Sequence, residues 1–321
     1  MKINWNWILV LTLILSSCGQ KTNSEENSQP ELTENSEAGN FYIQVADLEE
    51  ARDFYTWTSD RIPMVSAHRG GPYPGFPENA IETFENVTKY TPTIIEFDVA
   101  VTKDGVLVLM HDDDLERTTT GKGKVKDVTY EYIQDLYLED ETGAQTEFRV
   151  PTFKEALIWS KGKSLLTVDV KQSVPYEKLI AEIRETESEA HAAVITYSFA
   201  AAKKMHSLAP ELMLSITIRN DEEIQRFEET GIPWTRVIAF TGVAERPQEF
   251  NKALHEKGVF TILGVLGNLD RSAVARGDEI YTAFVQKGAD ILATDRPIEA
   301  ATAIQTLAPS NSSKASYFTR R

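Results

Sequence analysis

The sequence predicts an α/β fold in which a parallel sheet closes into a (β/α)8 barrel. Short runs of β-branched residues alternate with helix-like stretches through most of the chain, and this alternation is typical of a parallel sheet covered by helices. The alternating region, residues 41–307, has about the length of one barrel domain. Polar side chains follow the ends of several strand-like runs, and parallel barrels carry their active sites at such ends.

Nine segments are expected to form strands, one more than an eightfold barrel needs. They are residues 64–66, 94–99, 106–110, 165–170, 193–196, 212–218, 237–240, 259–263 and 290–294. The helix-like stretches are residues 77–90, 176–186, 200–208, 221–230 and 277–287. Only twelve residues separate Asp98 from His111, too few for a helical crossover, so the chain must return there in extended form. Which of the nine segments lies outside the barrel stays open.

The composition indicates an acidic globular protein. Of the 321 residues, 41% are hydrophobic and 26% are charged, and 33 Lys and Arg against 49 Asp and Glu give a net charge of −16. An acidic surface repels the phosphate backbone of nucleic acids, so we expect no nucleic-acid partner. An anionic substrate would need a locally positive pocket. The single cysteine, Cys18, excludes an intramolecular disulfide and a cysteine-based zinc cluster.

The N-terminus is typical of an export signal. A mostly apolar run over residues 8–15 is too short to span the ~30 Å hydrocarbon core of a bilayer. The residues at its end, Leu15-Ser16-Ser17-Cys18-Gly19, resemble the lipobox of bacterial lipoproteins, in which a lipidated cysteine becomes the mature N-terminus. We therefore predict a lipoprotein signal peptide over residues 1–17 and an envelope protein anchored to the membrane through Cys18. Gly19 favours the outer membrane, by resemblance to enterobacterial sorting.

Two flanking segments are expected to lie outside the folded domain. Residues 19–40 are mostly Ser, Asn, Glu, Gln and Thr and contain no aromatic side chain, so they cannot bury apolar surface. We predict a disordered tether over residues 18–40, followed by the barrel domain over residues 41–307. The Ser-rich, basic end, residues 308–321, is predicted to be a flexible tail.

Polar residues gather at the C-terminal ends of the predicted strands. They are His68, Glu96, Asp98, His111, Asp112, Asp169, Lys171 and Asp295. A parallel barrel brings those ends to one face, so side chains from separate segments should converge there. Glu96 and Asp98, two positions apart, point to the same face of a strand, and their like charges need a compensating cation. Mg²⁺ or Ca²⁺ would supply it, since both prefer oxygen ligands; pairing to an arginine, or exposure of one carboxylate, stays open.

A series of short motifs resembles the glycerophosphodiester phosphodiesterase family. The resemblance covers about residues 62–300 and rests on His68-Arg69-Gly70, Pro77-Glu78-Asn79, Glu96-Phe97-Asp98, Asp104-Gly105, His111-Asp112, Leu115-Glu116-Arg117-Thr118-Thr119, Pro151-Thr152-Phe153, Asp169-Val170-Lys171, Ser198-Phe199 and Thr294-Asp295. It implies a TIM (β/α)8 barrel of the phospholipase C-like phosphodiesterase type. With Cys18, it implies a bacterial lipoprotein member of that family.

The resemblance also implies a role for individual residues. Metal-binding carboxylates are matched by Glu96, Asp98 and Asp169, the acid/base pair by His68 and His111, and phosphate contacts by Arg69 and Lys171. These roles agree with the chemistry of phosphodiester cleavage. One divalent cation, Ca²⁺ or Mg²⁺, and two basic side chains would offset the charge of the phosphate. Two histidines can transfer protons near neutral pH.

Three departures from the family pattern are present. Asn79 is followed by Ala80 instead of Thr, and the third metal position is Asp169, one methylene shorter than the more usual Glu. A Trp-Thr-Val-Asn stretch of many members is replaced by residues 262–271. We therefore expect the aromatic wall of the pocket to be missing, which leaves the substrate less well defined than the reaction.

These observations predict metal-dependent hydrolysis of a small glycerophosphodiester to sn-glycerol 3-phosphate and an alcohol. One alternative is a phospholipase C- or D-like enzyme acting on a lipid, which would need an apolar patch facing the membrane. A second alternative is a non-catalytic surface lipoprotein that binds phosphoglycerol polymers. A binding protein needs no acid/base pair, so both histidines argue against it. The headgroup, the choice of cation, the direction of proton transfer, direct water attack or a cyclic phosphate intermediate, and the oligomeric state stay open.

Overall fold

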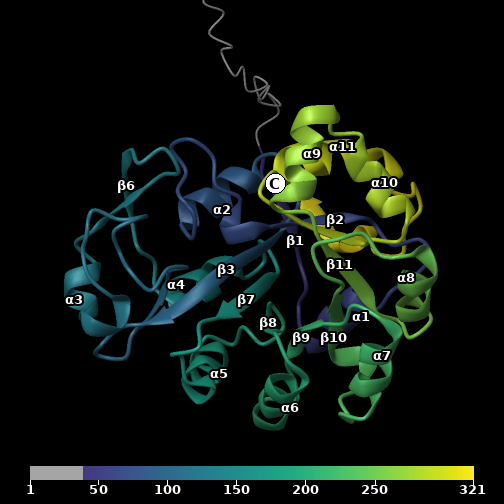
Figure 1. Ribbon diagram of the computed structural model, residues 1–321, viewed down its shortest axis with the longest axis horizontal. Helices are drawn as coiled ribbons and strands as arrows, with labels where there is room; N and C mark the ends of the chain where they lie inside the picture. Colours follow the sequence, from purple (N-terminus) through teal and green to yellow (C-terminus); the bar gives the residue numbers. More distant parts are fainter. Residues whose placement is uncertain (1–38) are drawn as a thin grey trace, which may run out of the picture. The chain divides into compact units, whose positions relative to one another are not determined.

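The computed structural model describes residues 39–321, and its centre is a closed barrel of eight parallel strands (Figure 1). Each strand pairs with the next around the ring, and β2 pairs with both β12 and β3, which closes it. The strands are β2 (Met64–Ala67), β3 (Ile94–Val101), β7 (Leu166–Val170), β8 (Ala192–Thr196), β9 (Met213–Thr217), β10 (Val237–Phe240), β11 (Phe260–Gly264) and β12 (Ile291–Thr294). The predicted TIM (β/α)8 barrel is confirmed.

The ninth predicted strand is the one that lies outside the ring. It is β4 (Leu107–Leu109), which pairs antiparallel with the far end of β3, with Val99 opposite Leu109. The turn between the two strands is closed by hydrogen bonds from the amides of Gly105 and Val106 to the backbone oxygen and the hydroxyl of Thr102. The chain therefore returns in extended form, as the short spacing between Asp98 and His111 requires.

The helices surround the strands (Figure 1), and three of them begin at a residue whose side chain caps the helix. They are α2 (Ile81–Thr88), α4 (Phe153–Ser160), α5 (Tyr176–Glu185), α6 (Phe199–Leu208), α7 (Asp221–Glu228), α8 (Gln248–His255), α9 (Asn268–Arg276), α10 (Ile280–Gln286) and α11 (Pro297–Ile304). Thr152 forms a capping box with Glu155, and Ser198 and Asn220 accept amide hydrogen bonds at the starts of α6 and α7. A single-turn helix η3 (Trp234–Arg236) precedes β10.

A segment inserted between β4 and α4 extends one side of the barrel (Figure 1). It contains η2 (Val125–Asp127), α3 (Tyr130–Ile133) and a hairpin of β5 (Tyr137–Glu139) and β6 (Gln145–Arg149). The segment, which begins at His111, contributes Leu115, Ile133 and Leu138 to an apolar cluster, and all three are at most 1% exposed. The same cluster includes Ala100 of β3 and Val108 of β4, so the segment packs against these two strands.

Helix α1 (Leu48–Tyr55) closes the end of the barrel at which the strands begin. Its Phe54 and Tyr55 are buried in one cluster with residues at the starts of the strands, among them Met64, Ile94 and Met213. The Asp47 side chain accepts hydrogen bonds from the amides of Glu49 and Glu50 and so caps the helix. The interior of the barrel is therefore filled with apolar side chains at this end.

The prediction of a flexible tail over residues 308–321 is wrong. After η4 (Gln305–Leu307) and η5 (Ala315–Tyr317), strand β13 (Phe318–Arg320) pairs antiparallel with β1 (Phe41–Ile43). Tyr317 and Phe318 pack on Phe54, with ring centroids 5.4 and 6.0 Å away. Lys314 is 3% exposed and donates hydrogen bonds to Asp53. The Ser-rich composition concealed this apolar pair, and the folded domain extends past residue 307 to the end of the chain.

Several predictions concern residues that the structure does not describe. The signal peptide over residues 1–17, the lipidation site Cys18 and the tether up to residue 38 all lie outside residues 39–321. Within the described range, every helix is too short or too polar to cross a bilayer.

Candidate active site

A pocket of about 330 Å³ opens at the C-terminal ends of the barrel strands. Its lining side chains lie two positions apart along several strands, because alternate side chains of a strand point to the same face. The lining residues are Ser66, His68, Glu96, Asp98, His111, Thr167, Asp169, Ile195, Tyr197, Ser215, Thr217, Phe240, Val243, Ile262, Leu266 and Ala293. Both predicted histidines and all three predicted carboxylates are therefore brought together in one cavity.

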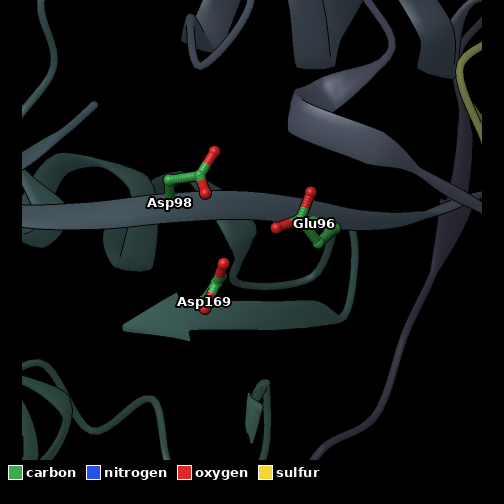
Figure 2. A group of neighbouring side chains, drawn as sticks. All are labelled: Glu96, Asp98 and Asp169. Atoms are coloured by element: carbon green, nitrogen blue, oxygen red, sulfur yellow. The ribbon is translucent and has the colours of Figure 1, made fainter. Parts of the chain in front are cut away.

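The three carboxylates come from two neighbouring strands. Glu96 and Asp98 lie on β3 and Asp169 on β7, and the register of the pair sets Asp98 directly beside Asp169. One oxygen of each carboxylate lies within 4.8 Å of one oxygen of each of the other two. Figure 2 shows the three side chains directed toward a common space between the strands. Three convergent oxygen donors are the ligand type that hard divalent cations prefer.

The pKa values of this cluster reflect crowded negative charge. Burial and the nearby Asp98 raise the pKa of Glu96 to about 8. Burial also raises the pKa of Asp169, and Asp98 adds to the effect although Lys171 opposes it. Two carboxyl groups with raised pKa values at one point indicate that the protein alone does not fully compensate the charge. The residues therefore fit a bound divalent cation, whose positive charge would compensate the carboxylates.

Asp98 is the most firmly held of the three. It accepts a hydrogen bond from Asn79 Nδ2 at 3.1 Å and one from Lys171 Nζ at 2.7 Å, while the Asp98 amide donates to Asn79 Oδ1 at 2.9 Å. Burial alone would raise its pKa, but Lys171 and Asn79 outweigh burial and hold the pKa below its usual value. Asn79 has a left-handed backbone, φ 58°, and this turn explains why α2 begins at Ile81 and not at residue 77 as predicted.

His68 lies in a single-turn helix, η1 (His68–Gly70), directly after β2. Its Nδ1 is 2.6 Å from Asp295 Oδ1, at the end of β12. The backbone of Arg69 is left-handed, φ 51°, and its amide donates to Glu96 Oε2 at 2.7 Å. A Cβ at Gly70 would lie 2.3 Å from the buried ring of Phe84, and φ is 86° there, so this turn requires glycine.

The environment of His68 shifts its pKa in two directions. Burial lowers the pKa, whereas the hydrogen bond to Asp295 and the negative charges of Glu96 and Asp295 raise it, and the net shift is upward. The protonated form of His68 is therefore favoured beside this carboxylate cluster.

His111 begins the inserted segment and is paired in the same way. Its Nδ1 is 2.6 Å from Asp112 Oδ1. Within residues 39–321, Nε2 of neither His68 nor His111 has a hydrogen-bond partner. Both rings therefore keep the same nitrogen available for a bound molecule.

A chain of ion pairs connects His111 to Arg69. Arg117 donates to Asp112 at 2.5 and 3.0 Å, and to both oxygens of Glu78 at 2.9 and 2.8 Å. Glu78 in turn accepts from Arg69 at 2.9 Å. Bidentate Arg–carboxylate pairs of this kind fix geometry as well as charge. These ion pairs thus fix the position of the segment around His111 relative to Arg69.

A comparison with protein families matches residues 68–247 to the glycerophosphoryl diester phosphodiesterase family. The chain belongs to this family. The matched range includes both histidines, all three carboxylates, Arg69 and Lys171. The predicted family is confirmed.

Individual relatives agree with this assignment. A glycerophosphodiester phosphodiesterase of Caldanaerobacter subterraneus is 32% identical over 160 residues, which cover 48% of this chain and 65% of that protein. Glycerophosphodiester phosphodiesterase 1 of the mouse is 40% identical over 101 residues, 30% of each chain. The matches to these two curated relatives therefore cover less than two thirds of their lengths.

Solved structures of the family share the fold. A glycerophosphoryl diester phosphodiesterase from Parabacteroides distasonis superposes with a TM-score of 0.84 and 37% identity, over 88% of this chain and 100% of that one. A phosphodiesterase from Oleispira antarctica, solved with the product sn-glycerol-3-phosphate, has a TM-score of 0.56 and 21% identity, over 79% of this chain and 98% of that one.

Arg69 and Lys171, the predicted phosphate contacts of this phosphodiesterase-family chain, lie beside the carboxylates. Lys171 Nζ is 2.7 Å from Asp98 and 3.6 Å from Asp169. Arg69 pairs with Glu78, and its Nε is 3.7 Å from Asp98. Neither side chain is among the residues that line the pocket. Both basic groups pair with carboxylates, and direct contact with a phosphate stays a prediction.

The aromatic wall expected to be missing is provided by other strands. Tyr197, at the end of β8, and Phe240, in β10, both line the pocket. Gly264 ends β11, and a Cβ there would lie 3.0 Å from both Phe240 and Val243. A residue without a side chain on β11 thus leaves room for the neighbouring aromatic ring.

Sequence reasoning identified the positions of several orienting residues without their roles. Asp112, Asp295 and Glu78 stood in recognised motifs, but their partners could not be read from the sequence. Tyr197, whose hydroxyl donates to Asp169 Oδ2 at 2.9 Å, was missed. Its only sequence signal is its place directly before Ser198-Phe199.

Proposed function

We propose that the chain is a metal-dependent phosphodiesterase that hydrolyses small glycerophosphodiesters to sn-glycerol 3-phosphate and an alcohol. The observation that carries this proposal is the convergence of His68 and His111 with Glu96, Asp98 and Asp169 in one pocket. A binding protein would need neither two aspartate-paired histidines nor a carboxylate cluster of this kind.

The two histidines have the arrangement needed for proton transfer. Each ring donates from Nδ1 to an aspartate and presents Nε2 to the pocket. One Nε2 can take a proton from the attacking oxygen, and the other can give a proton to the leaving alkoxide. The raised pKa of His68 is consistent with the protonated role.

Positive charge in the pocket would come from three sources. A divalent cation held by Glu96, Asp98 and Asp169 would polarise the phosphoryl group and offset its growing negative charge. Lys171 and Arg69, which lie beside Asp98, would add two further positive charges. A locally cationic site of this kind lets a protein of net charge −16 take an anionic substrate.

The choice of a small diester rests on the pocket and on one relative. A cavity of about 330 Å³ is at the lower end of the range for small-molecule sites. The Oleispira antarctica phosphodiesterase was solved with sn-glycerol-3-phosphate, which supports the same product here. A lipid substrate is the main competing outcome, because Tyr197 and Val243 expose apolar surface at 68% and 58% beside the pocket.

The direct test is ³¹P NMR of the products from a panel of glycerophosphodiesters and intact phospholipids, with and without EDTA. We expect sn-glycerol 3-phosphate from the small diesters, loss of turnover in EDTA and recovery when Ca²⁺ or Mg²⁺ is restored. Asp98→Asn should lose the activity while its far-UV circular dichroism stays unchanged. Turnover in excess EDTA would contradict the metal assignment, and cleavage of intact lipid alone would contradict the substrate.

We also propose that the protein is exported and lipid-anchored at Cys18, in the outer membrane. The support is the match of residues 15–19 to a lipobox. Fractionation of cells that express the wild type and Cys18→Ala tests this: only the wild type should partition with membranes and into detergent. Equal partitioning of the two would reject the anchor.

A further inference from the structure

We propose that Tyr197 is a positioning residue whose hydroxyl fixes the orientation of Asp169 as a ligand of the divalent cation. This inference rests on the proposed function and names a residue outside the motifs of the family. It follows from the geometry of Tyr197, from the looser hold on Asp169 and from the shorter side chain at that position.

Tyr197 reaches from the end of β8 to the neighbouring strand β7. It follows β8 directly, and β8 pairs with β7, which carries Asp169. The side chain of Ile195 also lines the pocket, two positions before Tyr197, so both point to the barrel interior. Tyr197 is 68% exposed, yet its hydroxyl donates to Asp169 Oδ2 at 2.9 Å. An exposed ring is therefore held in place through this hydrogen bond.

The three carboxylates differ in how firmly the protein holds them. Asp98 accepts from Asn79 and Lys171, and Glu96 accepts from the backbone amide of Arg69. Asp169 has the Lys171 ammonium only at 3.6 Å, beyond a good hydrogen bond, and the hydroxyl of Tyr197 at 2.9 Å. Asp169 is therefore the only one of the three whose orientation depends on a single side-chain donor, since Asp98 has two such donors and Glu96 is held by a backbone amide.

The short side chain of Asp169 makes its orientation important for binding the cation. An aspartate reaches one methylene less far than glutamate, so fewer rotations of its carboxylate bring an oxygen to the point shared with Glu96 and Asp98. Figure 2 shows one Asp169 oxygen directed toward the other two side chains. A hydrogen bond to Oδ2 restricts the rotation of the carboxylate, and such outer contacts commonly tune metal affinity.

The test compares Tyr197→Phe, which removes the hydroxyl and keeps the ring, with the wild type and with Tyr132→Phe. Tyr132 is an exposed tyrosine of the inserted segment, and its hydroxyl accepts from the amide of Lys122. Ca²⁺ and Mg²⁺ are titrated into the metal-free full chain by isothermal titration calorimetry. We expect Tyr197→Phe to bind the cation about 10–100-fold more weakly, and Tyr132→Phe to match the wild type.

The dependence of the rate on cation concentration gives a second measurement. It would not change if Tyr197 only stabilised the fold. The cation concentration for half-maximal activity should rise in Tyr197→Phe, and saturating cation should restore kcat with KM for the diester unchanged. A wild-type cation affinity in Tyr197→Phe would overturn the inference, as would a raised KM that persists at saturating cation, which would make Tyr197 a substrate contact. A wild type that binds cation but hydrolyses no diester would instead overturn the proposed function.

Discussion

Each histidine of the pocket has one ring nitrogen committed to an aspartate, His68 to Asp295 and His111 to Asp112. A carboxylate can only accept, so Nδ1 carries the proton in both rings and Nε2 faces the pocket. The hydrogen bond to each aspartate thereby determines the tautomer and the orientation of the ring. Their contribution should be visible in the pH dependence of the reaction.

Asp295→Asn is expected to move the pH profile toward lower pH. Burial lowers the pKa of His68, but the Asp295 bond and the charges of Glu96 and Asp295 raise it further. Without the Asp295 charge the pKa of His68 should fall, so the limb of the kcat/KM profile that His68 governs should shift to lower pH. The rate should fall by up to about 10²–10⁴-fold, the range for a general acid or base.

The matched control is Asp60→Asn, because Asp60 bonds to Ser313 at a distance from the pocket. Imidazole titration by NMR in the metal-free protein follows the pKa of His68 separately from turnover. An unchanged His68 titration in Asp295→Asn would show that Asp295 does not set the pKa.

At this scale the sequence supplied the identities of the functional residues and not their partners. The contact between His68 and Asp295 joins residues 227 positions apart, and only the closed barrel brings β2 beside β12. The Asp98–Lys171 pair likewise joins β3 to the residue after β7. Side-chain orientation depends on such contacts, so no local pattern could predict it.

Among the elements, the inserted segment is the one whose attachment bears on function. It supplies His111 and is tied to the barrel by Arg117, which bridges Asp112 and Glu78. Glu78 is only 6% exposed, and the guanidinium of Arg117 helps to hold its pKa low although burial would raise it. The position of His111 therefore depends on an ion pair between two elements.

Arg117→Gln is expected to loosen this attachment. Loss of the bonds to buried Glu78 should cost about 1–3 kcal/mol of unfolding free energy, less whatever Arg69 recovers. Amide hydrogen exchange should increase around residues 111–125, and kcat should fall because His111 is less well placed. Chemical denaturation, hydrogen exchange and turnover measure the three effects.

Lys154→Gln is a suitable control, since Lys154 forms an exposed pair with Glu185 and such pairs contribute about 0–1 kcal/mol. Wild-type exchange and turnover in Arg117→Gln would mean that apolar packing alone positions His111.

Most elements could be predicted from the sequence, and the exceptions have a common cause. The alternation of strands and helices located every barrel strand, because buried strands and amphipathic helices leave local patterns. The place of β4 outside the ring and the ordered C-terminal strand could not be predicted, because both are set by pairing with a distant or reversed neighbour. Residues 77–80 were expected to be helical, but Asn79 is used to hold Asp98.

On the scale of the whole domain, the pocket and the paired strands β1 and β13 lie at opposite ends of the barrel. The pocket opens where the strands end, whereas α1, β1 and β13 pack where the strands begin. Both of these strands, and the residues of the described chain next to them, therefore lie on the face away from the pocket.

Removal of residues 314–321 is expected to destabilise the domain without altering the chemistry of the folded fraction. The deletion removes the β1–β13 pairing, the packing of Tyr317 and Phe318 on Phe54, and the buried Lys314. Because both aromatic side chains are only partly buried, we expect a loss of about 2–4 kcal/mol. Thermal unfolding should show a Tm lower by several degrees.

Deletion of Arg321 alone serves as the control. The kcat of the truncated protein below its transition should equal that of the wild type, because the pocket is at the other end. An unchanged Tm would support the flexible tail that the sequence suggested.

The pairing of β1 with β13 also makes the two ends of the described chain neighbours. The amide of Arg321 donates to the backbone oxygen of Asn40 at 3.0 Å, so a short peptide linker could join these ends without crossing the barrel. New ends could then be opened at the exposed turn around Gly231, after α7. The domain is thus suited to circular permutation, in which the order of the strands along the chain changes while their order around the ring does not.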